Sequence, residues 1–349
     1  MPSARIAALA GLPAALLLAA VLPVPAPSRA ADPLEAPPMK LAGHAKGTYF
    51  LAFSPDSKRL ASGGCDKAVR IWDASTGAPV RALEGHAERV WGVAWSPDGT
   101  KIASGAWDNT AKIWDAATGT CLFTLSGHTQ HVTPVTWSPD GKFVVTGSDD
   151  SLAKVWDAAT GKHVRDLAGH KKGIHGVSWS PDGKSIATGS WDGTLAIWGA
   201  AAGKQVRSVP LNAGGVKDVA WTSDSSRIAC AAFKGAVFVV EAASGKILST
   251  GKVPGPAKAA KGKSGSQVQT VSFAPDGKRF VSGVHDGKAR IWDAASGKEL
   301  RSLAGHTPPC WSVAWSPDGS KIATGDESGA IRIWTAGEPP PPPAPPADP

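Results

Sequence analysis

The chain is poor in several residue types that often carry chemistry or define a fold class. It has 349 residues but only one tyrosine, two methionines and four cysteines. The cysteines share no short spacing and form no CxxC motif, and they are Cys65, Cys121, Cys230 and Cys310. Four cysteines in a chain of this length do not make a disulfide framework, and their spacing gives no support for a zinc site.

Several sequence patterns are also absent. No stretch of ten or more residues has helical periodicity, which argues against an α-helical or α/β fold. We find no glycine-rich phosphate loop, nucleophile elbow or paired-carboxylate motif, so the common enzyme classes lack their signatures. No hydrophobic run after residue 30 is long enough to cross a membrane.

The net charge is mildly positive and does not indicate a nucleic-acid partner. The full chain carries +8 at pH 7, and residues 1–30 contain two arginines and no acid, so residues 31–349 carry +6. A charge of this size mainly affects solubility. We therefore expect no nucleic-acid binding.

The first 30 residues are predicted to be a secretory signal peptide and not part of the fold. Arg5 supplies a positive start, an apolar run interrupted by Pro13 follows, and Ser-Arg-Ala stands before Ala31 as a cleavage site. An uncleaved membrane anchor is the alternative. Residues 31–36 are then a short linker, and the mature protein is expected in the periplasm or outside the cell. The alanine-, glycine- and proline-rich composition suggests a bacterial source.

The informative feature is an internal repeat. Four Gly-His pairs are spaced by 42 residues, and four tryptophans share that spacing, namely Trp72, Trp114, Trp156 and Trp198. One more step reaches Val240, Trp292 lies 52 residues beyond it, and Trp334 follows after another 42. The chain therefore contains seven repeats, with a ten-residue insertion before the sixth.

Each repeat reads as four short strands. Runs rich in Val, Ile and Trp alternate with Ser-Pro-Asp-Gly and Ala-Ala-Thr-Gly turns, as in residues 90–119. Proline at the second and glycine at the fourth turn position suit a type I turn. The whole region is therefore predicted to be all-β.

The period, the Gly-His start and the Trp-Asp end resemble the WD-repeat family, in an exported bacterial form. The resemblance covers residues 37–336 and implies a seven-bladed β-propeller of four-stranded antiparallel blades. The strand near Met39–Leu41 is expected to complete the last blade and to close the ring. Residues 337–349 are then a proline-rich disordered tail.

The resemblance also implies a structural hydrogen-bond network within each blade. It links histidine, Ser/Thr, aspartate and tryptophan, because buried polar groups need partners. The matching residues are His44, Ser62, Asp66, Trp72; His86, Ser104, Asp108, Trp114; His128, Thr146, Asp150, Trp156; and His170, Thr188, Asp192, Trp198. Repeat five lacks the set, repeat six has Ser264 in place of histidine, and repeat seven has Ser328 in place of aspartate.

Eleven of the fifteen tryptophans occupy periodic positions where blades pack, and four do not. These four fall in two register positions, one that opens the inner strand and one that precedes the network aspartate. In the family, similar positions surround the top mouth of the channel, where large aromatic residues suit an interface. The predicted partner-binding residues are Tyr49, Trp91, Trp107, His175, Trp191, Lys217, Phe233, His285 and Trp311. Alternatively, they pack against each other and cap the channel.

The leading hypothesis is a monomeric, non-enzymatic scaffold that binds a protein or peptide on its top face, without cofactor or metal. The alternative is a small-ligand-binding or metal-dependent propeller enzyme that uses the channel mouth. His131, Asp149 and His175 would then be the candidate metal ligands. A purely structural envelope protein is a third hypothesis. The lysines of residues 251–266 do not discriminate between these hypotheses.

The signal-peptide prediction is tested by the N-terminus of the secreted protein. Export of the full chain should yield a mature protein that begins near Ala31. Intact-mass measurement and N-terminal sequencing read this directly. Retention of residues 1–30 in a membrane fraction would instead support the uncleaved anchor.

Overall fold

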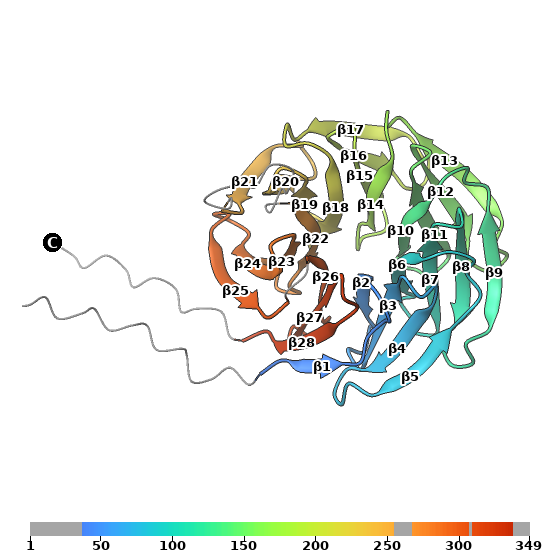
Figure 1. Ribbon diagram of the computed structural model, residues 1–349. Helices are drawn as coiled ribbons and strands as arrows, with labels where there is room; N and C mark the ends of the chain where they lie inside the picture. The colour runs from blue at the N-terminus through green and yellow to red at the C-terminus, as the bar shows by residue number, and fades with distance from the viewer. Residues whose placement is uncertain (1–36, 255–266, 307–308, 338–349) are drawn as a thin grey trace, which may run out of the picture. The chain divides into compact units, whose positions relative to one another are not determined.

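The computed structural model of the protein describes residues 37–254, 267–306 and 309–337. The described residues form 28 β-strands in seven four-stranded sheets, and all paired strands are antiparallel. This is the predicted seven-bladed β-propeller (Figure 1). In this part of the chain, no helix is long and apolar enough to span a membrane. The signal peptide, the linker, Ser264, most of the lysine-rich segment and the tail after Gly337 lie outside the described residues.

The strands of each blade follow one another outward from the ring centre (Figure 1). The inner strands are β2 (Thr48–Phe53), β6 (Val90–Trp95), β10 (Val132–Trp137), β14 (Ile174–Trp179), β18 (Val216–Trp221), β22 (Val268–Phe273) and β26 (Cys310–Trp315). The second strands are β3 (Arg59–Gly64), β7 (Lys101–Ala106), β11 (Phe143–Ser148), β15 (Ser185–Ser190), β19 (Arg227–Ala232), β23 (Arg279–Val284) and β27 (Lys321–Asp326).

The third strands are β4 (Val69–Asp73), β8 (Thr110–Asp115), β12 (Leu152–Asp157), β16 (Thr194–Gly199), β20 (Ala236–Glu241), β24 (Lys288–Asp293) and β28 (Ile331–Thr335). The outer strands are β5 (Pro79–Leu83), β9 (Cys121–Ser126), β13 (His163–Ala168), β17 (Gln205–Pro210), β21 (Ile247–Lys252), β25 (Glu299–Ala304) and β1 (Met39–Leu41). We number the blades one to seven from β2 to β26. The top face is the end of the blades where the inner strands begin, and the bottom face is the opposite end.

The turn between the first two strands of a blade is fixed by its own side chains. In blade two, the Gly99 amide donates to the Ser96 carbonyl at 2.9 Å, which closes the turn. The Ser96 hydroxyl donates to Asp98 at 2.5 Å, and Gly99 has a φ of 69°. Glycine adopts this left-handed conformation without the steric cost that other residues incur. The Ser-Pro-Asp-Gly sequence therefore sets where β6 ends and β7 begins.

The core lies between neighbouring blades. One buried cluster joins Ile71 and Leu83 of blade one to Val93, Ile102 and Trp114 of blade two. Trp114 is fully buried, and its counterparts in the other blades are at most 7% exposed. Burial of an aromatic side chain contributes several kcal/mol, by order of magnitude. Each blade is therefore stabilised mainly by its neighbours, and the ring depends on being closed.

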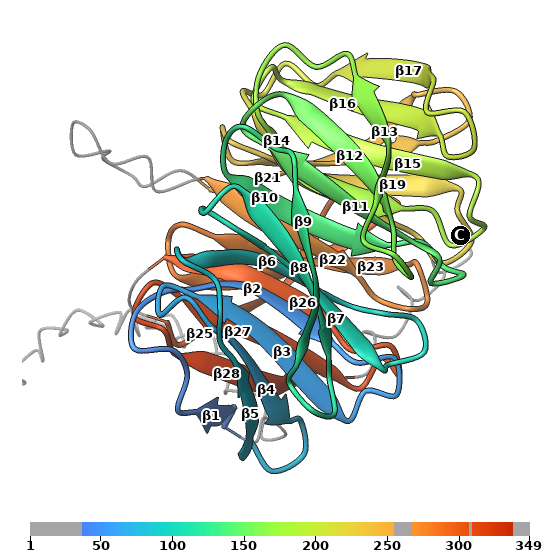
Figure 2. The ribbon, with the colours of Figure 1, turned by 90° about the vertical axis from the view of Figure 1, so that its right-hand side faces the viewer.

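The ring is closed by β1, as predicted. Met39, Lys40 and Leu41 pair with Ile333, Arg332 and Ile331 of β28. Blade seven therefore combines β1 from the start of the chain with β26 to β28 from its end, and β1 lies at its outer edge (Figure 2). Without β1, the backbone groups of β28 would form an unpaired edge.

Deletion of residues 37–42 should destabilise the whole ring. The deletion removes the β1 pairing and the buried Leu41 side chain, which is 5% exposed. We expect the melting temperature to fall by several degrees, because loss of a few kcal/mol shifts the midpoint by that amount. Calorimetry of the truncated and complete proteins measures this. An unchanged melting temperature would contradict closure by β1.

Candidate binding site at the mouth of the channel

Every inner strand has an irregular register near its top end. In β6, Val90 pairs with Ala106 and Gly92 pairs with Gly105, so Trp91 has no partner on β7. The same shift passes over Tyr49, His175, Lys217 and Trp311 in their blades. An extra residue in one strand bends the backbone and redirects its side chain. A repeated bulge therefore presents one side chain per blade at the mouth of the channel.

Four aromatic residues meet at this mouth, and we call them the aromatic belt. Trp91 stacks on Tyr49 at a centroid distance of 4.3 Å and on Trp107 at 5.6 Å. Trp311 meets Tyr49 edge-on at 5.9 Å and Trp91 at 6.0 Å. Offset-stacked and edge-to-face contacts of this kind stabilise aromatic pairs. The belt spans blades seven, one and two, which the closed ring makes neighbours.

The remaining predicted residues continue from the belt around the mouth. Trp191 lies 5.1 Å from Phe233 and 5.3 Å from His175, between ring centroids. His285 meets Trp311 edge-on at 6.1 Å. The Lys217 ammonium lies 5.0 Å from the Trp191 ring and 5.8 Å from the Trp311 ring. All nine predicted residues are thus connected by ring or cation–π contacts.

Eight of these nine side chains are half-buried, and Tyr49 is buried at 8% exposure. Burial and the hydrogen bond with Cys65 raise the pKa of Tyr49 to about 12, so its hydroxyl stays protonated. The indole nitrogens of Trp107 and Trp311 are buried without a hydrogen-bond partner in the described residues. Buried donors are usually paired, so two orphans at one surface are unusual.

Two further residues belong to this surface: Arg89 was missed by the sequence analysis, and His131 was predicted at the mouth only as a candidate metal ligand. The Arg89 guanidinium lies 4.5 Å from the centre of the Trp107 ring, and His131 stacks on the same ring at 4.6 Å. His131 also contacts the Trp107 carbonyl through Nδ1 at 2.9 Å. Neither residue is part of a periodic aromatic pattern in the sequence. The only available signal was their position just before the inner strand.

The predicted structural network is bonded as follows in blade two. His86 Nδ1 lies 2.8 Å from Asp108, and His86 Nε2 lies 2.8 Å from the Ser104 hydroxyl. The Trp114 indole donates to the same hydroxyl at 2.7 Å. One imidazole tautomer satisfies all three contacts, with Nδ1 donating to Asp108 and Ser104 donating to Nε2. Equivalent contacts join the four residues of blades one, three and four.

Blade seven corrects the prediction that its aspartate is missing. Asp326, two residues before Ser328, contacts His306 Nδ1 at 2.5 Å, while His306 Nε2 contacts Thr324 at 2.7 Å. The Trp334 indole donates to Thr324 at 2.8 Å, so the network is complete. The carboxylate therefore reaches the imidazole from the end of β27 and not from the turn that follows. Ser328 donates to Asp326 instead.

Blades five and six lack the complete hydrogen-bond network, each in a different way. In blade six, Asp286 is paired with Arg290, and the Trp292 indole still donates to Ser282 at 2.9 Å. In blade five, Cys230 and Val240 are buried in an apolar cluster. A polar network can be replaced by apolar groups at little cost when both partners are replaced together. Blade five therefore has no orphaned member of the set.

Comparison with known families agrees with this geometry. A family model described as the first β-propeller of IFT122 matches residues 89–259. The model of the WD domain, G-beta repeat, matches residues 36–73, 257–293 and 297–335. Together these matches cover residues 36–335 except for 74–88 and 294–296.

This chain is a seven-bladed β-propeller that contains WD repeats.

Similar proteins share single repeats with this propeller. An uncharacterized WD repeat-containing protein of Nostoc sp. is 54% identical over 39 residues, which is 11% of this chain and 3% of that protein. Protein Mut11 of Chlamydomonas reinhardtii is 52% identical over 40 residues, 12% of this chain and 11% of its own. The Notchless protein homolog of Arabidopsis thaliana is 50% identical over 40 residues, 12% and 8% respectively. The matches therefore span only a small part of these relatives.

The network aspartates of the propeller are held in the ionised form. Burial alone would raise the pKa of Asp66, but hydrogen bonds and charge from His44 and Arg70 outweigh it and lower the pKa to about 2. The pKa of Asp192 is also lowered to about 2, by hydrogen bonds from Thr194, Lys171 and His170 that outweigh burial. Hydrogen bonds to a carboxylate favour its charged form. These groups are satisfied within their blades, which fits a structural role.

The three candidate metal ligands do not come together. His175 Nε2 lies 2.8 Å from Asp149, whereas His131 is stacked on Trp107. Among the described residues, no group of three His, Cys, Asp or Glu side chains could hold a metal ion. The alternative of a metal-dependent enzyme therefore loses its best candidate site. The four cysteines all lie in the described part of the chain as free thiols.

Asp218 is an unexpected buried acid beside the mouth. It follows Lys217 in β18, is 4% exposed, and lines a cavity of about 520 Å³ along the channel. Burial raises its pKa to about 7, although it accepts hydrogen bonds from the Val219 and Val271 amides at 2.9 and 3.0 Å. The folded protein therefore binds a proton more tightly here than the unfolded chain, so this contribution to stability falls as pH rises from about 4 to about 7. In the sequence, Asp218 is the only charged residue at its register position.

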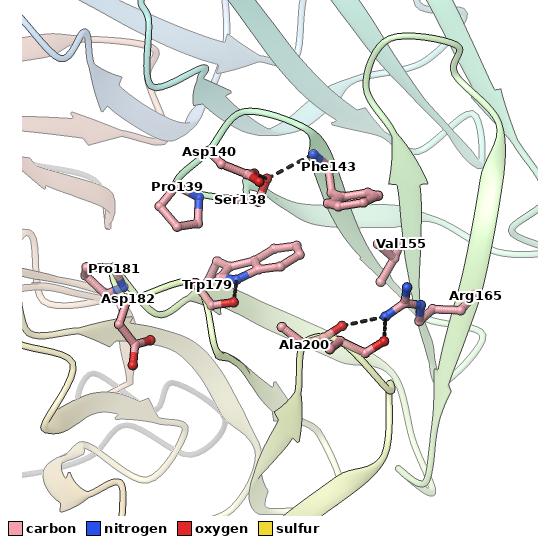
Figure 3. A pocket seen from close by; sticks show the side chains of 12 residues that line it. Ser138, Pro139, Asp140, Phe143, Val155, Arg165, Trp179, Pro181, Asp182 and Ala200 are labelled. Atoms are coloured by element: carbon pink, nitrogen blue, oxygen red, sulfur yellow. Dashed lines mark hydrogen bonds between the residues drawn. The ribbon is translucent and has the colours of Figure 1, made fainter.

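A second cavity of about 580 Å³ opens on the bottom face, between blades three and four (Figure 3). Phe143 and Trp179 line it, with ring centroids 6.3 Å apart. The Trp179 indole donates to Gly183 of its own blade at 3.1 Å, whereas Trp137 donates to Ala94 of the preceding blade. The Trp179 indole nitrogen is thus bonded within blade four, while its ring stacks on Phe143 of blade three. This cavity lies on the face opposite the predicted site and contains none of its residues.

Substitution Ser104→Ala tests the structural network. It leaves both the Trp114 indole and His86 Nε2 without a partner, and each buried unpaired group costs about 1–3 kcal/mol. Ser282→Ala is the matched control, because Ser282 accepts the Trp292 indole and no histidine occupies the corresponding position of its repeat. Urea unfolding should show a clearly larger loss for Ser104→Ala. Equal losses would contradict a role for the histidine contact.

Proposed function

We propose that this propeller is a non-enzymatic interaction module that binds a protein or peptide segment across the aromatic belt. The WD-repeat propeller fold is consistent with an interaction scaffold. Since the fold itself does not specify a function, the proposal depends on the site. On the basis of its predicted signal peptide, we further propose that the protein is exported; we also propose that it acts as a monomer.

The observation that carries the proposal is the continuous aromatic surface made by Tyr49, Trp91, Trp107 and Trp311. These rings come from the bulged ends of inner strands and from one adjacent turn, and none belongs to the buried hydrophobic clusters between blades. Large aromatic residues dominate binding energy at protein interfaces, where they bury much area with little loss of side-chain entropy. Three of the four remain half-exposed, so a partner could still cover them.

Packing of the rings against one another is compatible with binding of a partner as well as with capping of the channel. Stacked rings are already held in place, so a partner would not need to order them. The unpaired indole nitrogens of Trp107 and Trp311 add a specific attraction. If the atoms that cover either nitrogen shifted slightly, a partner carbonyl could accept a hydrogen bond from it. That bond would contribute about 1 kcal/mol or more to the binding free energy.

A different exposed apolar set is less suited to recognition. Its members are 38–64% exposed and lie on the outer strands of blades one to six, namely Val80, Leu122, Val164, Val206, Ile247, Leu248 and Leu300. Because they recur around the rim at the repeat spacing, they do not gather into one patch. They provide a matched comparison for the belt.

The combined substitution Trp91→Ala, Trp107→Ala and Trp311→Ala should abolish partner capture. Removal of three large rings takes away the apolar anchors, and such anchors contribute about 2 kcal/mol or more each at interfaces. Affinity capture from an envelope extract of the source organism, with quantitative mass spectrometry, measures the loss. Thermal melting checks that the ring stays folded.

The control variant carries Val80→Ala, Leu122→Ala and Val206→Ala on the outer strands. It removes exposed apolar area elsewhere and should capture the same proteins as the wild type. Undiminished capture by the tryptophan variant would refute binding through the belt. Loss of capture in both variants would also refute it, since capture would then not depend specifically on the belt.

A further inference from the structure

Lys217 has surroundings unlike those of any other charged side chain at the mouth. It is the bulged residue of β18 in blade five, and its ammonium lies 5.0, 5.7 and 5.8 Å from the rings of Trp191, Phe233 and Trp311. Trp191 belongs to blade four and Trp311 to blade seven, so the ammonium lies among rings from three blades. We call Lys217 and these three rings the lysine cage.

The Lys217 ammonium has only one hydrogen-bond acceptor in the described residues. Nζ donates to Gln269 Oε1 at 2.9 Å, although an ammonium has three N–H groups. No carboxylate in this part of the chain forms an ion pair with it. Burial lowers the pKa of Lys217 to about 8, and no neighbouring acid opposes that shift. The group is thus partly desolvated without a counter-ion.

Two acids near the mouth, Asp149 and Asp218, have other partners and are not the counter-ion of Lys217. Asp149 contacts His175 at 2.8 Å. The carboxyl of Asp218 accepts hydrogen bonds from two backbone amides beside the channel. On the opposite side of the mouth, Arg89 adds a second cation over Trp107. A bound segment therefore meets cations and aromatic rings, and an acidic segment complements them.

A carboxylate fits the cage better than a neutral acceptor does. Hydrogen bonds between charged partners are roughly twice as strong as neutral ones, and a partly desolvated ammonium gains most from a charged acceptor. Cation–π contacts hold Lys217 in place but leave its free N–H groups without acceptors. A C-terminal carboxylate is usually held by several backbone amides, whereas the contacts around Lys217 are ring faces and one amide oxygen.

We propose that Lys217 anchors the side-chain carboxylate of an aspartate or glutamate in the bound protein segment, while Trp191, Phe233 and Trp311 receive the apolar residues beside that acid. This inference rests on the proposed function, because it assigns the chemistry of the segment that binds at the mouth. It explains why a lysine stands at a register position where three other blades place Tyr49, Trp91 and Trp311.

The test begins with a library of random 12-residue peptides, selected on the folded, mature propeller. Peptides enriched on the wild type over the Trp91, Trp107 and Trp311 variant are synthesised with amidated C-termini. We expect them to share an acidic residue flanked by apolar residues. The strongest such peptide is the probe for the binding measurements.

The decisive measurement is a double-mutant cycle between the probe and Lys217. Replacing the shared acid of the probe by its amide should weaken binding to the wild type at least about tenfold, as expected for a charge-assisted hydrogen bond. The same change should alter binding to Lys217→Met less than about twofold, because the partner charge is gone. Lys234→Met is the matched control, since Lys234 is an exposed lysine of the same blade and should behave as the wild type.

The outcomes separate the two proposals. Probes that need the tryptophans but share no acid, or whose acid is insensitive to Lys217→Met, overturn the lysine anchor and leave the proposed function standing. Probes that bind only with a free C-terminus also overturn it. If no peptide is enriched over the tryptophan variant, the proposed function fails and the anchor fails with it. Melting curves and a second variant, Lys217→Gln, exclude misfolding as the cause of a loss.

Discussion

The pairing of β1 with β28 is the interaction on which the rest of the ring depends. A blade buries its apolar faces only against its neighbours, so a ring with an open edge would expose two faces at once. Three residues from the beginning of the chain, Met39–Leu41, remove that edge by joining strands from its end. Closure also brings blades seven, one and two together, and the aromatic belt exists only because of that contact.

Within the closed ring, each blade combines a fixed scaffold with one variable position. The scaffold consists of the turn residues, the buried tryptophan and, in most blades, a complete polar network such as that of Asp108 and His86. Bulges in the inner strands leave residues such as Trp91 unpaired at the mouth. Because the scaffold does not need these side chains, they can differ from blade to blade. The propeller can therefore carry a specific surface without loss of its repeat.

The variable side chains at the mouth cost folding free energy, and binding of a partner could offset that cost. Trp107 and Trp311 have buried indole nitrogens without partners, and Lys217 is partly desolvated without a counter-ion. In the scaffold, by contrast, the described hydrogen bonds pair each network group with another. Among the described residues, buried unpaired atoms also occur at Arg207, Arg279 and Arg332, but only at the mouth do they lie beside a partly desolvated lysine and a set of contacting aromatic rings. The opposite face has a cavity beside Trp179, but the polar side chains Trp179 and Arg165 that line it donate to backbone carbonyls of the propeller itself.

The sequence by itself determined the scaffold, because the turn residues act locally and the seven repeats follow one another by 42 residues in all but one step. It also singled out Trp107 as a residue outside the repeat. It could not predict that Asp326 replaces the missing aspartate of blade seven, since that depends on which side chain reaches His306 in space. Nor could it predict the lysine cage, whose members lie in three different blades. Only closure of the ring brings Lys217 and Trp311 within reach of each other, because their contact joins residues that no local pattern links.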